Sequence, residues 1–144
     1  MVLFKFLLPL CLMVKAQGFD PAVVDTSLRT DAANIVKAGY NLRVVLMGPE
    51  QNVSVLAAQI QGTTWDGTGI GYGVRGGRSH ELTTRLEDII QLYRDRVPRA
   101  PILFDYSPDS ALWAVTRKFP RAGSDCAKSP GKDLGFGVFC DVCG

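Results

Sequence analysis

Four side chains that could transfer protons or hold carbonyl oxygens follow apolar runs of this sequence: Glu50, Arg75, Asp105 and Tyr106. A carboxylate can act as a general base, a tyrosine can donate a proton, and an arginine presents a planar fork of N–H donors to carbonyl or carboxylate oxygens. We therefore interpret Asp105 or Glu50 as a catalytic base, Tyr106 as a proton donor or orienting group, and Arg75 as the group that holds substrate oxygens. A second set is predicted to contact substrate: Arg78, Gly71, Gly73, Ser107 and Asp20.

Other site chemistries find less support in the residue types. The single histidine, His80, leaves the serines with few ways to form a catalytic triad, and no G-x-S-x-G run is present. Cys140 and Cys143 form a C-x-x-C pair, but together with Cys126 and His80 they match no zinc-finger spacing. We expect no metal and no cofactor, and a disulfide from Cys126 to Cys140 or Cys143 only if the protein is exported.

The candidate residues must be positioned by the elements around them, and the most unusual of these is a glycine-rich run. We predict a strand over Thr68–Val74, which would place Gly69, Gly71 and Gly73 on one face because side chains alternate along a strand. Three glycines on one face indicate close approach of a neighbouring helix or of a flat ligand. An amphipathic helix over about 80–97 follows.

The same run matches the dinucleotide-binding pattern G-x-G-x-x-G through Gly71, Gly73 and Gly76. In that fingerprint the first glycine ends a strand, whereas here the glycines are expected to begin inside one. Asp105, the candidate ribose-binding acid, lies about 29 residues beyond Gly76, against a usual spacing of about 20. The alternative to an enzyme is therefore a non-catalytic α/β module that binds a small molecule or a nucleotide.

Apolar periodicity predicts an α/β domain, a small flavodoxin-like or Rossmann-like three-layer sandwich with a mainly parallel sheet of about four strands in the order 2-1-3-4. In such sheets ligands bind beyond the carboxyl ends of the strands, which is where the candidate residues fall. Asp109 is expected to cap the last helix, and Trp65 and Trp113 are expected to be packing residues. The other predicted strands cover 10–14, 42–47 and 102–105, and the other helices cover about 25–38, 52–61 and 110–118.

The chain is expected to form one domain over 18–120, flanked by two less regular parts. Residues 1–17 are predicted to contain the first strand, which would follow Pro9. Alternatively, they form a secretory signal that is cleaved after Ala16. Residues 121–144 read as an extension with a short edge strand at Leu134–Val138, which could pair with a partner and give a homodimer. We expect a cytoplasmic protein. The alternative is a secreted protein, if residues 1–16 are a signal peptide.

Charge and the length of the apolar runs argue against a nucleic-acid partner and against a membrane span. The net charge is +2 over 144 residues and no lysine or arginine block is present, so a nucleic-acid interface is not expected. The apolar run at the N-terminus is too short and too interrupted for a membrane span.

The sequence resembles a family of short fungal proteins found in polyketide gene clusters, some of which are similar to the cyclases of aurovertin-type pathways. The resemblance covers about residues 18–143. It rests on a glycine strand followed by an arginine, a long helix and a Ser-Pro turn, in these segments: Arg43–Gln51, Gly67–Gly76, Arg85–Asp95, Ala100–Asp109 and Ser129–Phe136.

This resemblance implies a polyketide cyclase that closes a linear acyl chain to an α-pyrone by lactonisation. Such a reaction needs a base for the enol proton and a donor for the developing oxyanion, and needs neither a nucleophilic residue nor a metal. The substrate would be a polyketide acyl chain delivered by a polyketide synthase. The roles of individual residues follow from their strand-end positions and not from the resemblance.

Overall fold

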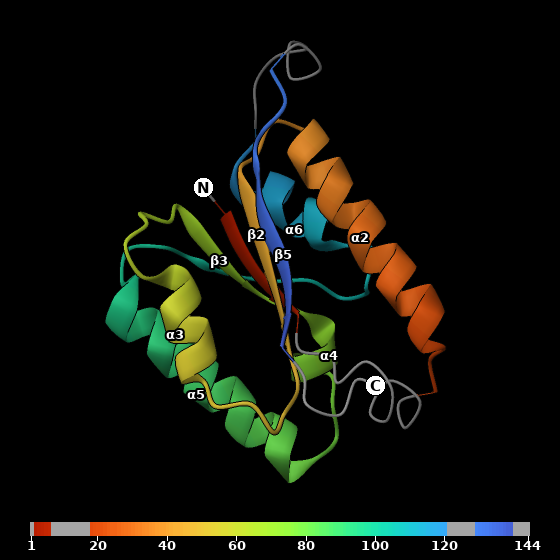
Figure 1. The fold of residues 1–144 in the computed structure, drawn as a ribbon, viewed down its shortest axis with the longest axis vertical. Coiled ribbons are helices and arrows are strands. Elements are labelled where there is room, and N and C mark those ends of the chain that lie inside the picture. The colour runs from red at the N-terminus through yellow and green to blue at the C-terminus, as the bar shows by residue number, and fades with distance from the viewer. Residues whose placement is uncertain (1, 7–17, 121–128, 140–144) are drawn as a thin grey trace.

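The computed structural model describes residues 2–6, 18–120 and 129–139, and for residues 2–6 it describes the backbone. Strands and helices alternate along most of this chain (Figure 1). The strands are β1 (Val2–Phe6), β2 (Leu42–Met47), β3 (Gly67–Ile70), β4 (Ile102–Phe104) and β5 (Asp133–Phe139). The helices are α2 (Pro21–Lys37), α3 (Ser54–Ile60), the single turn α4 (Tyr72–Arg75), α5 (His80–Arg96) and α6 (Ala111–Lys118).

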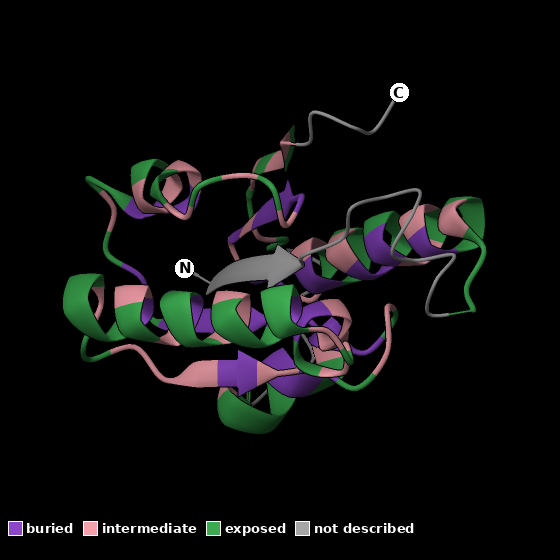
Figure 2. Cartoon of the chain, turned by 90° about the horizontal axis from the view of Figure 1, so that it is seen from below, coloured by how far each residue is buried: buried purple, intermediate pink, exposed green. Residues whose placement is uncertain are grey.

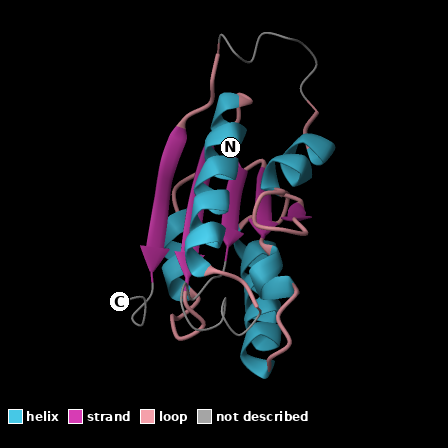
Figure 3. Cartoon of the chain, turned by 90° about the vertical axis from the view of Figure 1, so that its right-hand side faces the viewer, coloured by secondary structure: helices cyan, strands magenta, loops and turns pink. Residues whose placement is uncertain are grey.

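All the strands join one five-stranded sheet in the order β4-β3-β1-β2-β5, and every neighbouring pair is parallel. Their arrows therefore point the same way, and α2 lies across one face of them (Figure 3). The carboxyl ends of the strands meet at one edge of the sheet. The segments that leave β3 and β4 at this edge carry most of the predicted site.

Helices cover both faces of the sheet and enclose two apolar cores. On one face α2 packs beside α6, and the core includes Leu28, Val44 and Val115. On the other face α3 packs beside α5, and the core includes Leu56, Ile70 and Tyr93. The buried stripes of the helices face inward while their outer faces are exposed (Figure 2). The predicted α/β class with a parallel sheet is confirmed.

The helix starts follow from local capping. Asp20 accepts the N–H of Ala22 at 2.8 Å and Pro21 occupies the first turn of α2, where its missing N–H costs nothing. Ser79 accepts the N–H of Leu82 at 3.2 Å and begins α5. Asp20 therefore serves as a helix cap, the role that its position before Pro21 favours, rather than standing free to contact substrate.

The prediction that the glycine strand extends to Val74 is wrong. The strand ends at Ile70, and Tyr72–Arg75 form α4. The neighbouring strand β4 also ends at this level, since Ile70 pairs with Phe104, and beyond this pair the N–H of Tyr72 donates to the Asp105 carboxylate. The bare face of three glycines does not form, and Gly71 instead precedes the turn.

The two remaining strand predictions concern the two ends of the chain. The strand expected at 10–14 falls outside the described residues, and the first described strand is β1, which precedes Pro9. The expected edge strand at 134–138 corresponds to β5, which extends the main sheet beside β2. A sheet of about four strands is therefore corrected to one of five. Within the described part of the chain, no helix has the length and apolar character needed to cross a membrane.

Candidate functional site

Asp105 is the first residue after β4 and lies almost fully buried, with 1% of its surface exposed. Its Oδ1 accepts the N–H of Tyr72 at 2.5 Å, while Oδ2 is buried and has no hydrogen-bond partner among the described residues. Burial raises the pKa of Asp105 from its ordinary value of 3.8 to about 7. The Tyr72 hydrogen bond and the charge of Arg75 lower this pKa, and nearby Asp31 raises it. The carboxyl group therefore exchanges its proton near neutral pH.

The turn α4 brings Arg75 to the same place. Nη2 of Arg75 donates to the main-chain oxygen of Asp105 at 3.0 Å, and its guanidinium lies 5.2 Å from the centre of the Tyr72 ring. Gly76 follows the turn, and a Cβ at this position would overlap the Tyr72 ring. The main chain and side chain of Asp105 thus hold both ends of α4, and the structure brings together Tyr72, Arg75 and Asp105.

The loop after Asp105 is built around the hydroxyl of Ser110. Its Oγ accepts the N–H groups of Tyr106 and Ser107, both at 2.9 Å, and donates to the main-chain oxygen of Ser107 at 3.0 Å. Ser107 Oγ donates to Asp109 at 2.6 Å. The hydroxyl of Ser107 is therefore engaged within its own loop, and Asp109 supports this loop rather than capping the last helix, which corrects the predicted role of Asp109.

Two exposed aromatic side chains stand next to this loop. Tyr106 is 59% exposed and Trp113 on α6 is 43% exposed, and their rings meet edge to face with centroids 5.1 Å apart. Arg117 lies over the Trp113 ring at 4.2 Å. Trp65 is a buried packing residue, as expected, whereas Trp113 lies largely on the surface. The predicted proton donor, Tyr106, is thus accessible beside a buried acid.

Asp31 is a residue that the sequence analysis missed. It lies buried in the middle of α2, and its Oδ2 accepts the N–H groups of Ala111 and Leu112 at 2.7 and 3.1 Å, so it caps α6 from another helix. Burial raises its pKa, although the two N–H donors act against that change. The available signal was its position on the apolar stripe between Leu28 and Ile35, where an acid needs a buried partner.

The alternative base, Glu50, lies in a different setting. It is exposed in the loop between β2 and α3, and its carboxylate folds back against Gly48, where a Cβ would overlap it. Arg85 of α5 holds this loop by donating to the main-chain oxygens of Pro49 and Gln51 at 2.8 and 2.5 Å. Of the two predicted bases, only Asp105 has the buried environment that brings its pKa near 7.

The remaining predicted contacts surround α4. Gly71 is buried and precedes its first residue, Gly73 lies within it, and Arg78 is exposed before α5. Gly71 directly follows β3, so the glycine motif resembles the dinucleotide fingerprint more than the sequence suggested. However, the N–H at the start of α4 already binds the Asp105 carboxylate, which occupies the place of a phosphate. This arrangement disfavours a nucleotide.

Metal ligands do not gather in the described part of the chain, where no cluster of three histidine, cysteine, aspartate or glutamate residues could hold an ion. Cys126, Cys140 and Cys143 lie outside the described residues.

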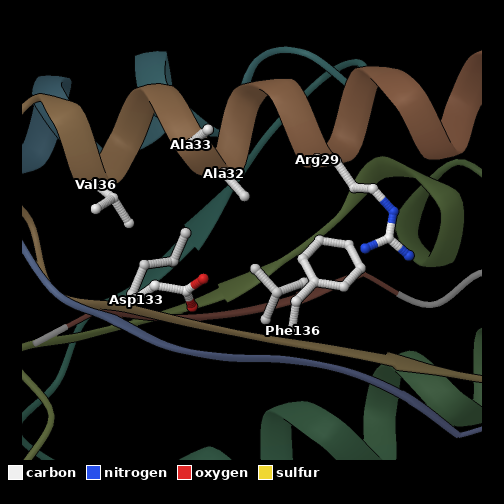
Figure 4. Close-up of a pocket in the computed structure, with 8 residues that line it drawn as sticks. Arg29, Ala32, Ala33, Val36, Asp133 and Phe136 are labelled. Carbon is white, nitrogen blue, oxygen red and sulfur yellow. The ribbon is translucent and has the colours of Figure 1, made fainter.

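A separate cavity of about 320 Å³ opens between α2 and the strands β2 and β5. Arg29 lies at one end and Asp133 at the other (Figure 4). The guanidinium of Arg29 stacks over the Phe136 ring at 4.4 Å, and its Nε donates to Asp25 at 2.8 Å. The apolar lining consists of Ala32, Ala33, Val36, Leu42, Val44 and Phe136.

Comparison of the chain with protein-family models, with curated proteins and with solved structures returned no match.

Proposed function

We propose that this protein is an acid–base cyclase that closes a linear, enolisable polyketide acyl chain to an α-pyrone, with Asp105 as the group that moves the proton. The observation that carries the proposal is the state of this carboxyl group: buried, with one oxygen lacking a hydrogen-bond partner among the described residues, and with a pKa of about 7. A general acid–base group works best when its pKa lies near the working pH. The substrate class comes from the sequence resemblance.

The position of Asp105 also supports a catalytic role. In an open parallel sheet covered by helices, ligands bind beyond the carboxyl ends of the strands, where the strand order reverses. In the order β4-β3-β1-β2-β5 that point is the boundary between β1 and β3, and α4 leaves β3 there. Asp105 at the end of β4 reaches this boundary through its hydrogen bond to Tyr72.

The reaction needs one proton removed and one returned. In its ionised form Asp105 takes the proton of the enol at C5 of the acyl chain, and the enol oxygen bonds to the acyl carbonyl carbon, so that an oxyanion forms. The oxyanion collapses and the bond to the leaving group breaks, releasing a thiol from a thioester or water from a free acid. Asp105 returns its proton to that leaving group, which regenerates the base.

Two neighbours suit the other requirements of this reaction. Arg75 is exposed and uses Nη2 on the main chain of Asp105, so its other N–H groups can hold the substrate oxygens and stabilise the oxyanion. Tyr106 is exposed next to the acid and can orient the enol through its hydroxyl. Oδ2 of Asp105 is closed off from solvent in the free protein, so substrate binding must open this edge before proton transfer.

The proposal is tested by adding the purified protein to a linear 3,5-diketo acyl thioester and measuring pyrone by its ultraviolet spectrum and mass. We expect Asp105→Asn to slow cyclisation by about 10²- to 10⁴-fold, the usual contribution of a general acid–base group. Asp88→Asn, which removes an exposed carboxylate from α5, is the matched control and should keep the wild-type rate. An unchanged rate in folded Asp105→Asn, or no acceleration by the wild type over buffer, refutes the proposal.

A further inference from the structure

We propose that the cavity between α2 and β5 is a second binding site, for a small amphipathic monocarboxylic acid whose carboxylate binds Arg29. This site goes beyond the proposed cyclisation and does not depend on it. Helix α2 separates the two sites, because Asp31 on one side of the helix reaches α6 while Ala32, Ala33 and Val36 line the cavity on another side.

The cavity lies where the edge strand β5 and its neighbour β2 face α2. Helix α2 packs against β2 and α6, and the guanidinium carbon of Arg29 lies 4.4 Å from the centre of the Phe136 ring of β5. The resulting space of about 320 Å³ falls in the lower part of the usual range for small-molecule sites, roughly 300–1,000 Å³. Its floor and walls are apolar, so it suits a hydrocarbon body rather than a polar one (Figure 4).

Arg29 determines which head group fits. The guanidinium of Arg29 makes a cation–π contact with the Phe136 ring, and this contact takes up no hydrogen-bond acceptor. Nε is bonded to Asp25, whereas the two Nη groups have no other acceptor among the described residues. These two nitrogens form the end of the fork that binds a carboxylate through two parallel hydrogen bonds.

Charges at the two ends select a monoanion and set its direction. Asp25 already offsets the charge of Arg29 and would repel a dianion such as a phosphate ester. Asp133 lies at the opposite end of the cavity, so a carboxylate is repelled there and attracted to the Arg29 end. The ligand therefore lies along α2, with its carboxylate near the solvent-exposed Arg29 and its apolar body toward Val36.

The test uses octanoate, with 1-octanol as the probe that keeps the apolar body and lacks the charge. Both are titrated into the isotope-labelled full chain, and binding is followed through the amide signals of residues that line the cavity. We expect octanoate to shift the signals of Ala32, Val36 and Phe136 and to bind about fivefold more tightly than octanol, as for an exposed charge-assisted pair.

Four variants separate the contributions. Arg29→Leu should remove the preference for octanoate, and Asp25→Asn should strengthen octanoate binding without changing octanol binding, because it frees the charge of Arg29. Ala33→Trp, an exposed position at the rim, should block both probes, whereas Ala22→Trp on the same helix but outside the cavity should block neither. Shifts confined to other residues, equal affinity for both probes, or full binding by Ala33→Trp would overturn the proposal.

Discussion

The buried carboxyl group of Asp105 makes a specific prediction for the pH dependence of folding. Its pKa is 3.8 in the unfolded chain and about 7 in the folded protein, so the folded state holds the proton more tightly. Between these values the folded state binds more protons than the unfolded state, and stability falls as the pH rises. At about 1.4 kcal/mol per pKa unit, a difference of roughly three units corresponds to a loss of about 4 kcal/mol between pH 4 and pH 8.

Asp105→Asn removes this titration while keeping the shape of the side chain. The amide oxygen can still accept the N–H of Tyr72, but the amide N–H₂ replaces an oxygen that has no partner among the described residues. At pH 4 the protonated carboxyl has one buried O–H donor without a partner, whereas the amide has two N–H donors. An additional unsatisfied donor costs about 1–3 kcal/mol, so the variant should be less stable than the wild type at pH 4. At pH 8, where the wild type carries the full cost of a buried charge, the variant should be the more stable of the two.

The assay is urea unfolding of both proteins at intervals between pH 4 and pH 8. The quantity of interest is the difference between the two free energies of unfolding, because most other titrations cancel in it. This difference should change by up to about 4 kcal/mol in favour of the Asp105→Asn variant as the pH rises. Asp88→Asn controls for loss of one surface carboxylate. A difference that stays constant across this pH range would show that Asp105 is not perturbed by burial and would also remove the basis of the proposed catalysis.

Three other predictions follow from the contacts and exposure of single residues. Asp31→Ala should lower the free energy of unfolding, measured in urea, by about 2–3 kcal/mol, because one buried and one partly buried N–H group at the start of α6 lose their acceptor. A loss below about 0.5 kcal/mol would contradict this. Trp113 is 43% exposed and Trp65 is 5% exposed. Trp113→Phe should therefore remove most of the tryptophan fluorescence that acrylamide quenches, whereas Trp65→Phe should retain that quenchable fluorescence. The reverse result would contradict the placement of these two residues. Gly131→Ala should lower the free energy of unfolding by about 2 kcal/mol or more, because the new Cβ would overlap the main chain of Tyr40. Thermal and urea unfolding measure this loss. Wild-type stability would show that residue 131 lies farther from the main chain of Tyr40.

Elements with a strong local signal could be predicted from the sequence. The strand at Leu42–Met47 was predicted with its observed bounds, and the helix expected at about 80–97 is α5, because an apolar run and an amphipathic stripe are local properties. The start of α2 was set too late, although Asp20 followed by Pro21 is a capping signal that the sequence contains.

Features that depend on neighbouring strands could not be predicted in this way. The glycine run could have continued as a strand to Val74, but the length of a strand is decided by its partners, and β4 ends at Phe104. The strand expected at 10–14 falls outside the described residues, and β1 lies before Pro9, where it pairs with β2 and β3. The length and register of each strand depend on partners far apart in the chain, so local patterns do not determine them.

The candidate site was predictable in its residue types and not in its environment. Position after a strand was enough to select Asp105 and Tyr106, because the carboxyl ends of parallel strands meet at one edge. Arg75 was selected from a strand expected to reach Val74, whereas β3 ends at Ile70 and α4 carries Arg75. The burial of Asp105, its bond to the start of α4 and its proximity to Asp31 arise from packing between separate elements. These contacts distinguish Asp105 from Glu50, and they are the reason that one carboxylate and not the other became the proposed base.

The placement of β5 has a consequence for how the chain folds during synthesis. The chain leaves β4 at one edge of the sheet and adds β5 at the other, so residues 133–139 pair with a strand made some 91 residues earlier. Such distant pairing is slow because a long loop must close first. Until the ribosome has released these residues, the apolar strand β2 presents an unpaired edge, which is a surface where nascent chains associate with one another. Chaperone dependence and aggregation of this protein in cells should therefore depend on how quickly β5 docks.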